Sequence, residues 1–426
     1  MMTLVERHVI KRGHKLFQEL DLICFCSKNL YNLTNYHIRQ EFFRSGNIFS
    51  YNNLDKLLQK TEAYLELPAK VSQQVLQQVS RDWKSWQEAS LEYIANPTKF
   101  KAQPRIPTYK DKKNGRNILI YTSQAISSKY LRKGLVQFSK TKLRIRTKKK
   151  EINQVRIVPR QGYIVVEVVY EQLIEKVALD KNRVAGVDIG VSNLGAVTSN
   201  VMGFNPLLIN GNPLKTINSY YNKERAYLQS QLGENQFLSK ELEKLTIKRN
   251  SKVENYLHQA SRLIIDTLVK NQIGSLVIGK NLQWKQDINL GKVNNQNFVF
   301  IPHAKFISML KYKAQLVGIK VVILEESYTS KCSFLDFEPI QKQETYKGKR
   351  IKRGLFRSAN NILINADINA SANIIRKAFP NAFADGIQAV VVRPARVNLK
   401  KSLNPRKPTS HIIAQTVQKS GFIGLL

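Results

Sequence analysis

Two short apolar segments that lie far apart in the chain each carry an aspartate, Asp188 and Asp367. The first reads Val-Ala-Gly-Val-Asp-Ile-Gly over residues 184–190, and the second reads Leu-Ile-Asn-Ala-Asp-Ile-Asn-Ala over residues 363–370. Hydrolysis of a phosphodiester with two divalent cations needs several carboxylates drawn from separate elements. Taken singly, either Asp fits a turn or a helix N-cap, but the pair favours a metal-dependent nuclease site.

The elements that must position these carboxylates are predicted from the patterns around them. A buried strand ends at Asp188, which is where open α/β sheets place their chemistry, and Asp367 begins an apparent helix. Between them the pattern alternates strands with helices, which implies a largely parallel sheet flanked by helices and fits an RNase H-like fold. The predicted elements are strands at 194–198, 275–279 and 320–326, a long helical stretch at 214–269 interrupted near Gly233, and a helix at 298–316.

The part of the chain before residue 184 has a different pattern. A strand at 3–11 is followed by helical periodicity to about residue 95, with Trp83 on the apolar face of a later helix. Strands are predicted at 117–121, 143–146, 154–159 and 163–170. With the first strand they are expected to close a small OB-like β-barrel that a helical insertion interrupts, so the fold class is α/β plus β-barrel and helical parts.

Positive charge dominates the composition. The chain has 68 Lys and Arg against 31 Asp and Glu, a formal net charge of +37 and a pI near 10.1, which makes a long polyanion the expected partner. Residues 99–150 hold 17 Lys and Arg and one acid, Asp111. Solvated loops and a charge-protected edge strand are the alternatives to nucleic-acid contact. The candidate nucleic-acid-binding residues are Lys99, Lys101, Arg105, Arg144, Arg146, Lys148, Lys149, Lys150, Lys349 and Arg350.

Three cysteines, Cys24, Cys26 and Cys332, are too few and too scattered for a disulfide framework and fit a reducing compartment. No apolar run approaches the roughly 20 residues of a membrane span, and residues 1–8 lack the apolar core of a signal peptide. We therefore expect a cytoplasmic protein without a membrane partner.

The order of several motifs resembles TnpB, the nuclease family that insertion sequences encode and that is ancestral to type V CRISPR effectors. The motifs span nearly all of residues 1–395. They are Lys-Asn-Leu-Tyr-Asn at 28–32, Trp-Lys-Ser at 83–85, Pro-Thr-Lys-Phe at 97–100, Val-Arg-Ile-Val-Pro at 155–159, Gly-Val-Asp-Ile-Gly at 186–190, Tyr-Thr-Ser-Lys-Cys-Ser at 328–333 and Asn-Ala-Asp-Ile-Asn-Ala-Ser-Ala-Asn-Ile at 365–374.

The resemblance implies an RNA-guided DNA endonuclease. An element-derived guide RNA and target double-stranded DNA would be its partners, a short motif beside the target would be recognised, and one RuvC-like site would cleave with Mg²⁺ or Mn²⁺. A monomer is favoured. The implied boundaries are 1–13 for the first strand of a wedge barrel, 14–105 for a helical recognition insertion, 106–180 for the rest of the barrel, 181–327 for the first part of the RuvC-like domain with a helical insertion, 328–362 for a zinc-finger-like insertion lacking cysteine pairs, 363–400 for the last part of the RuvC-like domain and 401–426 for a basic flexible tail.

One departure from the family pattern affects the expected catalytic residues. The second catalytic residue of most members is a Glu at the end of a strand, and here that position is Gly279. Glu325 and Glu326 follow the next strand, about 4.8 Å away in a parallel sheet, and a Glu side chain spans that shift. Because strand side chains alternate, at most one of the two is expected to reach the site, and Glu326 is slightly favoured. Asp385, between Ala384 and Gly386, fits a turn, and as a residue after the last helix it is also a further candidate for the metal site.

The other departure concerns zinc. Members of the family commonly carry two Cys-x-x-Cys pairs before the last Asp, whereas here Cys332 stands alone and residues 353–358 contain no Cys or His. We expect an insertion without zinc that folds on Phe334, Leu335, Phe337 and Phe356. Its cations, among them Lys349, Arg350 and Arg353, are expected to contact nucleic acid near the active site or to form a solvated loop.

Three functions remain open at this point. An active RNA-guided nuclease is favoured by the intact motifs around Asp188 and Asp367. A nuclease-dead RNA-guided binder that regulates or blocks DNA is suggested by the loss of the Glu at position 279. A transposase that joins DNA ends itself shares the fold, but the guide-holding barrel and the helical insertion argue against it.

Overall fold

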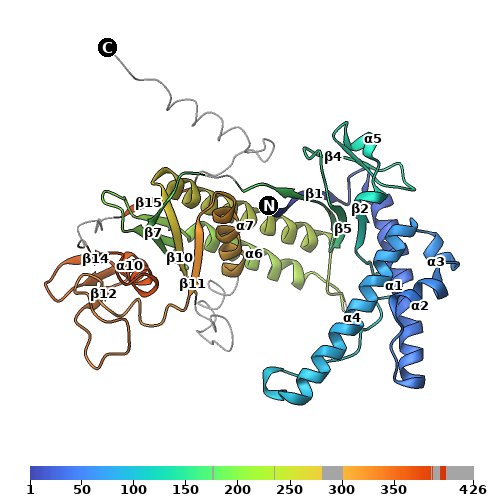
Figure 1. Ribbon diagram of the computed structural model, residues 1–426, viewed down its shortest axis with the longest axis horizontal. Helices are drawn as coiled ribbons and strands as arrows, with labels where there is room; N and C mark the ends of the chain where they lie inside the picture. The colour runs from blue at the N-terminus through green and yellow to red at the C-terminus, as the bar shows by residue number, and fades with distance from the viewer. Residues whose placement is uncertain (175–176, 235, 281–300, 385, 387–393, 400–426) are drawn as a thin grey trace, which may run out of the picture. The chain divides into compact units, whose positions relative to one another are not determined.

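The computed structural model describes the chain except for residues 175–176, 235, 281–300, 385, 387–393 and 400–426 (Figure 1). The chain folds into two compact units. Residues 1–175 and 223–249 form the first unit, and residues 176–222 and 250–426 form the second. No helix in the described part of the chain is both long enough and apolar enough to cross a membrane.

The first unit contains a helical segment inserted between strands. Its elements are β1 (Met2–Lys11), α1 (Phe17–Ser45), α2 (Tyr51–Leu58), α3 (Glu62–Leu65), α4 (Ala69–Ala95), η1 (Pro97–Lys99), β2 (Leu119–Thr122), η2 (Ser123–Ala125), α5 (Ser128–Leu131), β3 (Leu135–Gln137), β4 (Arg144–Arg146), β5 (Gln154–Arg160) and β6 (Tyr163–Gln172). The predicted switch from strand to helix and back to strand is therefore present. The short β3, whose three residues carry little pattern, was not predicted.

The strands expected to form a barrel occur as two hydrogen-bonded pieces. One is an antiparallel sheet in the order β1-β6-β5-β2, in which Met2 pairs with Gln172 and Lys11 with Tyr163. The other is a two-stranded ribbon of β3 and β4. No ladder between described strands joins the two pieces into a ring.

The helices α1 and α4 pack around aromatic side chains. Trp83 is fully buried, and its Nε1 donates a hydrogen bond of 2.8 Å to Asn35 Oδ1 on α1. Phe42 and Trp86 contact the same ring, with centroids 5.4 and 5.5 Å from that of Trp83. The predicted apolar face thus forms the core, and Cys24 lies within it.

A ladder from α1 holds the extended basic segment at residues 107–112. Lys28 Nζ donates to Lys112 O at 2.8 Å, and Asn32 both donates to Lys110 O and accepts from Lys110 N at 2.9 Å. One turn further along α1, Asn35 and Arg39 both donate to Pro107 O. Because these residues are spaced by three or four positions, they line one face of the helix. The Lys-Asn-Leu-Tyr-Asn motif therefore fixes the path of a basic strap.

The second unit is built on a six-stranded sheet in the order β11-β10-β7-β8-β9-β15. Its strands and shorter helices are β7 (Asp180–Asp188), β8 (Asn193–Ser199), β9 (Leu207–Asn210), β10 (Ile273–Gly279), α9 (His303–Leu316), β11 (Lys320–Leu324), β12 (Lys349–Lys352), β13 (Leu355–Arg357), β14 (Leu363–Asn365), α10 (Ala366–Ala378) and β15 (Ala395–Val397). Two long helices, α6 (Asn212–Ser230) and α7 (Lys240–Lys270), are divided between the units, because residues 223–249 belong to the first unit. Within the sheet, β11, β10, β7, β8 and β9 lie side by side in that order, which is the strand order of an RNase H-like sheet, as predicted.

The prediction of a largely parallel sheet was too strong. β10 pairs in parallel with both β7 and β11, and β15 pairs in parallel with β9, but β7–β8 and β8–β9 are antiparallel. The reason is loop length, since the short connections after Asp188 and Ser199 allow a hairpin and cannot hold a crossover helix. Both β9 and β15 are short and lack a clear alternation, and neither was predicted.

Gly186 in β7 brings α10 directly onto the sheet. A Cβ atom at this position would lie 2.4 Å from Ser371 O and 2.8 Å from Ile375 Cγ1. The Ser371 hydroxyl in turn donates to Gly186 O at 2.8 Å. The glycine therefore sets the close approach between the strand that carries Asp188 and the helix that carries Asp367.

Candidate active site

Three of the predicted carboxylates meet at one edge of the second unit's sheet. Asp188 is the last residue of β7, Asp367 is the second residue of α10, and Glu326 follows the end of β11 by two residues. Because β7, β10 and β11 are parallel, their carboxyl ends lie at the same edge, where α/β sheets carry ligand sites.

The start of α10 is held by its N-cap. The Asn365 side chain accepts hydrogen bonds from Asp367 N at 3.0 Å and from Ile368 N at 3.2 Å. The Asp367 carboxylate is oriented by two donors, Asn193 Nδ2 at 2.7 Å and Arg350 Nη2 at 3.3 Å. Asn365 is therefore the N-cap of α10, and the Asp367 side chain, held by Asn193 and Arg350, does not cap the helix. The turn reading of this residue is therefore wrong.

The pKa of Asp188 responds to the other two carboxylates. Burial raises the pKa of Asp188 well above its usual range, the charges of Asp367 and Glu326 raise it further, and Arg350 opposes them. Burial raises the pKa of Glu326 to about 7. Groups with shifted pKa values of this kind gather at functional sites, where burial and like charge act together.

Glu326 fills the space beside Gly279. A Cβ atom at Gly279 would lie 2.7 Å from Glu326 Oε2 and 3.3 Å from Glu326 Cβ. Glu326 Oε2 is buried, and no donor in the described part of the chain bonds to it. Glu325 is exposed, and it contributes only its backbone oxygen, to Lys377 Nζ at 2.8 Å.

The predicted strand at 320–326 ends earlier, at Leu324. The alternation of strand side chains therefore does not decide which glutamate points inward. The burial of the Glu326 side chain decides it instead.

A cavity of about 850 Å³ opens in front of Asp188 and Asp367. Cations line its other walls, and two of them, Lys215 and Arg353, donate to the Ser192 hydroxyl in the turn after Asp188. Such a combination of carboxylates and facing cations suits a phosphodiester, because the cations would balance the negative charge of the phosphate. The cations are Lys215, Arg350, Arg353 and Arg396.

Sequence reasoning missed Asn193, Lys215 and Arg396 at this site. Asn193 begins β8 and Lys215 lies in the first turn of α6, so each follows a strand end at the same edge of the sheet. That position was the available signal, but it required the two strands of the hairpin to be placed first. Arg396 had no signal, because β15 was not predicted.

Within the described ranges, no three His, Cys, Asp or Glu side chains lie close enough together to hold one metal ion as they stand. The oxygens of the Asp367 carboxylate instead accept hydrogen bonds from Asn193 and Arg350. Shared metal coordination by these carboxylates would therefore require side-chain rearrangement.

The raised pKa of Glu326 predicts how stability depends on pH without divalent cations. Between the ordinary glutamate value of 4.5 and about 7, the folded chain holds a proton that the unfolded chain has released. The free energy of unfolding therefore falls as pH rises through this window. We expect the Tm of the unmutated chain, relative to Glu326→Gln, to fall between about pH 5 and about pH 8 in a chelator. An equal difference in Tm at both pH values would contradict this.

The insertion at 328–362 has a small apolar core without paired cysteines. Phe334 and Phe356 are buried as predicted, and Leu335 is partly buried. Phe337 is 46% exposed, so its predicted core role is wrong; instead its ring lies 5.2 Å from the Arg376 guanidinium. Cys332 is buried, and its Sγ lies 3.3 Å from Pro339 O.

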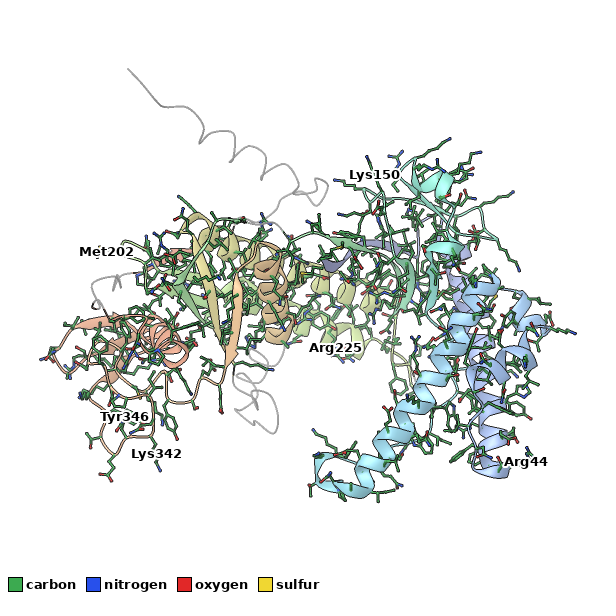
Figure 2. All side chains as sticks on the ribbon, viewed as in Figure 1. Arg44, Lys150, Met202, Arg225, Lys342 and Tyr346 are labelled. Carbon is green, nitrogen blue, oxygen red and sulfur yellow. The ribbon has the colours of Figure 1, made fainter. Side chains whose placement is uncertain are left out.

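The first unit carries most of the predicted nucleic-acid-binding residues. On β4 and the residues that flank it, Leu143, Ile145 and Thr147 are buried while Arg144, Arg146 and Lys148 are exposed, as the alternation predicted. Arg144 stacks on the Tyr130 ring at 4.2 Å, and Lys149 lies 3.7 Å from the Tyr170 ring. Lys150 projects beside the same ribbon (Figure 2). These residues form a basic face, which we call the basic ribbon and define as residues 144–150.

The other predicted cations are placed separately. Lys101 and Arg105 are exposed, while Lys99 is exposed and pairs with Glu92 at 2.5 Å. Lys349 and Arg350 lie on β12 of the second unit, and both are exposed. Asp385 and the tail at 401–426 lie outside the described residues.

Comparison with known proteins identifies the family. Residues 163–285 match the family model OrfB_IS605, described as a probable transposase, and residues 303–374 match the Cas12f1-like TNB domain. The chain is 25% identical over 407 residues to the TnpB-like protein ORF457 of Acidianus two-tailed virus, which covers 85% of this chain and 84% of that protein. It is 29% identical over 213 residues to the CRISPR-associated endodeoxyribonuclease Cas12f2 of Micrarchaeota archaeon (strain CG1_02_47_40).

The match to Cas12f2 covers 46% of this chain and 37% of that protein, so this chain matches less than half of that relative's length. A solved Cas12f1–sgRNA–target DNA complex resembles the fold with a TM-score of 0.52 at 17% identity, over 84% of this chain and 83% of that chain. The RuvC-containing fold of these proteins agrees with the sheet described above. The two family models and the two relatives support a TnpB-family protein.

Proposed function

We propose that this protein is an RNA-guided DNA endonuclease that cleaves guide-matched DNA beside a short motif. Its relatives include a CRISPR-associated endodeoxyribonuclease, and its fold resembles a protein solved with a guide RNA and target DNA. The observation that carries the nuclease proposal is the position of Glu326. Its side chain occupies the space beside Gly279 and raises the pKa of Asp188, so a third carboxylate has been kept at the site.

The residues at this site fit divalent cations. Asp188, Glu326 and Asp367 offer the hard oxygen ligands that Mg²⁺ and Mn²⁺ prefer, and the buried Glu326 Oε2 lacks a donor among the described residues. Bound cations would supply Lewis-acid stabilisation of charge that develops on the phosphodiester. We assign metal binding to these three carboxylates, and to Arg350, Arg353 and Lys215 the binding and orientation of the phosphate backbone.

A nuclease-dead binder is the second candidate function. It rests on the glycine at position 279 and on the Arg350 contact, which neutralises Asp367 within the protein. The filled space beside Gly279 argues against it, because a decayed site would not be expected to keep a buried carboxylate whose burial opposes its charge.

A cleavage assay tests the proposed function directly. The full chain is purified with the RNA that accompanies it, that RNA is sequenced, and DNA matching its guide segment is offered with a randomised flanking sequence. We expect cuts only beside one flanking motif, and only when Mg²⁺ or Mn²⁺ is added. Tight binding without cleavage in either metal would favour the nuclease-dead binder, and joined DNA ends formed without RNA would favour a transposase.

The basic ribbon is expected to bind the guide RNA. Replacing Arg146, Lys148 and Lys150 with Gln removes three exposed cations, so RNA affinity should fall and the slope of log K against log salt should drop by about 2. Filter binding across a salt series measures both quantities.

The matched control removes the same charge elsewhere in the first unit. Lys56, Lys60 and Lys70 are also exposed, and their replacement with Gln should change the slope less. If both triple variants weaken RNA binding equally, the ribbon is not a specific contact and only net charge matters.

A further inference from the structure

The insertion at 328–362 is held together by two carboxylates that the nuclease mechanism does not use. Glu338 is 2% exposed, and both of its oxygens accept backbone hydrogen bonds. Oε2 accepts from Ser333 N at 2.6 Å, and Oε1 accepts from Lys347 N at 2.9 Å. Buried charge is costly unless it is hydrogen-bonded, so a carboxylate here stabilises one specific arrangement of these two backbone segments.

Asp336 makes a second link of the same kind. Its Oδ2 accepts from the Ser333 hydroxyl at 2.5 Å and from Ala359 N at 2.8 Å. Ser333 lies in the turn after Cys332, and Ala359 lies in the turn that Ser358 N closes onto Ile362 O. The two carboxylates therefore join three backbone segments of the insertion. We call Asp336 and Glu338 the carboxylate clasp.

The clasp is attached to the helix that carries Asp367. Asn369 and Asn373 on α10 are fully buried, and both donate through Nδ2 to Cys332 O, at 2.9 and 2.8 Å. Asn369 Oδ1 also accepts from Phe334 N, and Arg376 donates to Glu338 O. The turn that contains Ser333, whose N–H donates to Glu338, is thus fixed to one face of α10. Figure 1 shows α10 beside β14, which it contacts.

The other end of the clasp leads to Arg350. Lys347, whose N–H binds Glu338, lies two residues before β12, and β12 carries Arg350. Lys342 and Tyr346 project from the loop between Glu338 and β12 (Figure 2). Arg350 Nη2 in turn reaches Asp367 Oδ1 at 3.3 Å. The contacts form a closed circuit from α10 through Glu338 and β12 back to α10.

We propose that Glu338 is a positioning residue for the active site. By joining the Ser333 turn, which is fixed to α10, to the loop before β12, it holds Arg350 at the wall of the cavity beside Asp367, where the phosphate backbone would bind. The two carboxylates of the clasp join backbone turns, which is the structural role that a bound metal ion can have. This proposal rests on the proposed function only where cleavage is the readout.

The chemistry of the clasp makes its two members respond differently to amide substitution. Both Glu338 oxygens accept N–H groups, so Glu338→Gln places an amide NH₂ against a backbone N–H and breaks one link. Both Asp336 bonds end on Oδ2, so Asp336→Asn keeps an acceptor there. We therefore expect Glu338→Gln to be severe, Asp336→Asn to be mild, and Glu344→Gln, an exposed glutamate of the same insertion, to have no effect.

Hydrogen exchange on the full chain tests the clasp without any cleavage. In Glu338→Gln one of the Lys347 and Ser333 amides, the one that then faces the glutamine NH₂, should exchange at least about tenfold faster than in the unmutated chain, while amides of α10 keep their protection. Asp336→Asn should retain the slow exchange of Ala359. Unchanged exchange at Lys347 and Ser333 in Glu338→Gln, or one zinc ion per purified chain, would overturn the proposal.

Cleavage by the guide-loaded complex tests the positioning role. Because small displacements of a catalytic group can cost on the order of 100-fold, Glu338→Gln should lose about that much in kcat with unchanged affinity for DNA. In the Arg350→Ala background, Glu338→Gln should cause no further loss in kcat, since Glu338 acts on the site through Arg350. Losses that multiply, or unmutated kcat in Glu338→Gln, would overturn the proposal. If the unmutated complex cuts no DNA, the proposed function fails. Hydrogen exchange then remains as the test of whether Glu338 joins the two backbone segments.

Discussion

Glu326→Gln is expected to abolish cleavage, whereas Glu325→Gln leaves it unchanged. The Glu326 carboxylate is buried beside Gly279 and Asp188, so its loss removes a proposed metal ligand worth several kcal/mol, or more than about 100-fold in rate. Glu325 is exposed and uses only its backbone oxygen. Single-turnover cleavage of guide-matched DNA across a Mg²⁺ or Mn²⁺ series measures both variants. Equal rates for the two variants would contradict the assignment.

A swap of positions sharpens this test. Adding Gly279→Glu to Glu326→Gln would not restore the site, because the glutamine at 326 still fills the space that the new side chain needs. A Cβ atom at position 279 would lie 2.7 Å from the Oε2 position of residue 326. Glu326→Gly with Gly279→Glu opens that space, leaving the flexible tip of Ile374 at 2.6 Å as the remaining close contact. Net charge equals that of the unmutated chain, so recovered cleavage would report ligand geometry and not the overall field.

Asp188→Asn is expected to remove cleavage and at the same time to raise stability. Asp188 is a proposed metal ligand whose charge is opposed by burial and by the neighbouring Asp367 and Glu326 carboxylates. Removing that charge relieves the repulsion, a trade of activity for stability that active sites commonly show. We expect cleavage to fall by more than about 100-fold, unchanged affinity for guide-matched DNA, and a higher Tm in chelator.

The matched control is Asp180→Asn, at the exposed opposite end of the same strand. It removes an exposed charge that pairs with Arg183 at 3.4 Å, and the Asn side chain keeps an oxygen that can accept from Asn182 N, so it should leave cleavage intact and stability nearly unchanged. Loss of DNA binding in Asp188→Asn, or a lower Tm than the unmutated chain, would show that Asp188 has a structural role instead.

The sequence predicted the elements of the site better than the directions of its side chains. Asp188 and Asp367 follow from local patterns, because a buried strand end and a helix start are each written in a few adjacent residues. Choosing between Glu325 and Glu326 required the point at which β11 ends, and strand ends are the least predictable part of a pattern. Burial distinguishes the two side chains, which alternation could not do.

Contacts that join distant segments were beyond the sequence. Asn193 and Arg350 meet at Asp367 only after β8, β12 and α10 have been assembled. The Glu338 carboxylate has no local signature, since a buried acid in a polar loop looks like any solvated one until its two N–H partners are placed. Short elements such as β9 and β15 depend on pairing with each other and carry too few residues for a period.

The pairing of β15 with β9 also determines where the chain can be shortened. Ala395–Val397 cover the outer edge of β9 in a parallel ladder, and Asn398 Oδ1 accepts from Asn210 Nδ2 at 2.8 Å. A chain ending before residue 395 would leave the N–H and C=O groups of a half-buried strand exposed, and such edges template intermolecular pairing. Truncation after Leu399 keeps this cover, so it should remain monodisperse where the shorter chain aggregates.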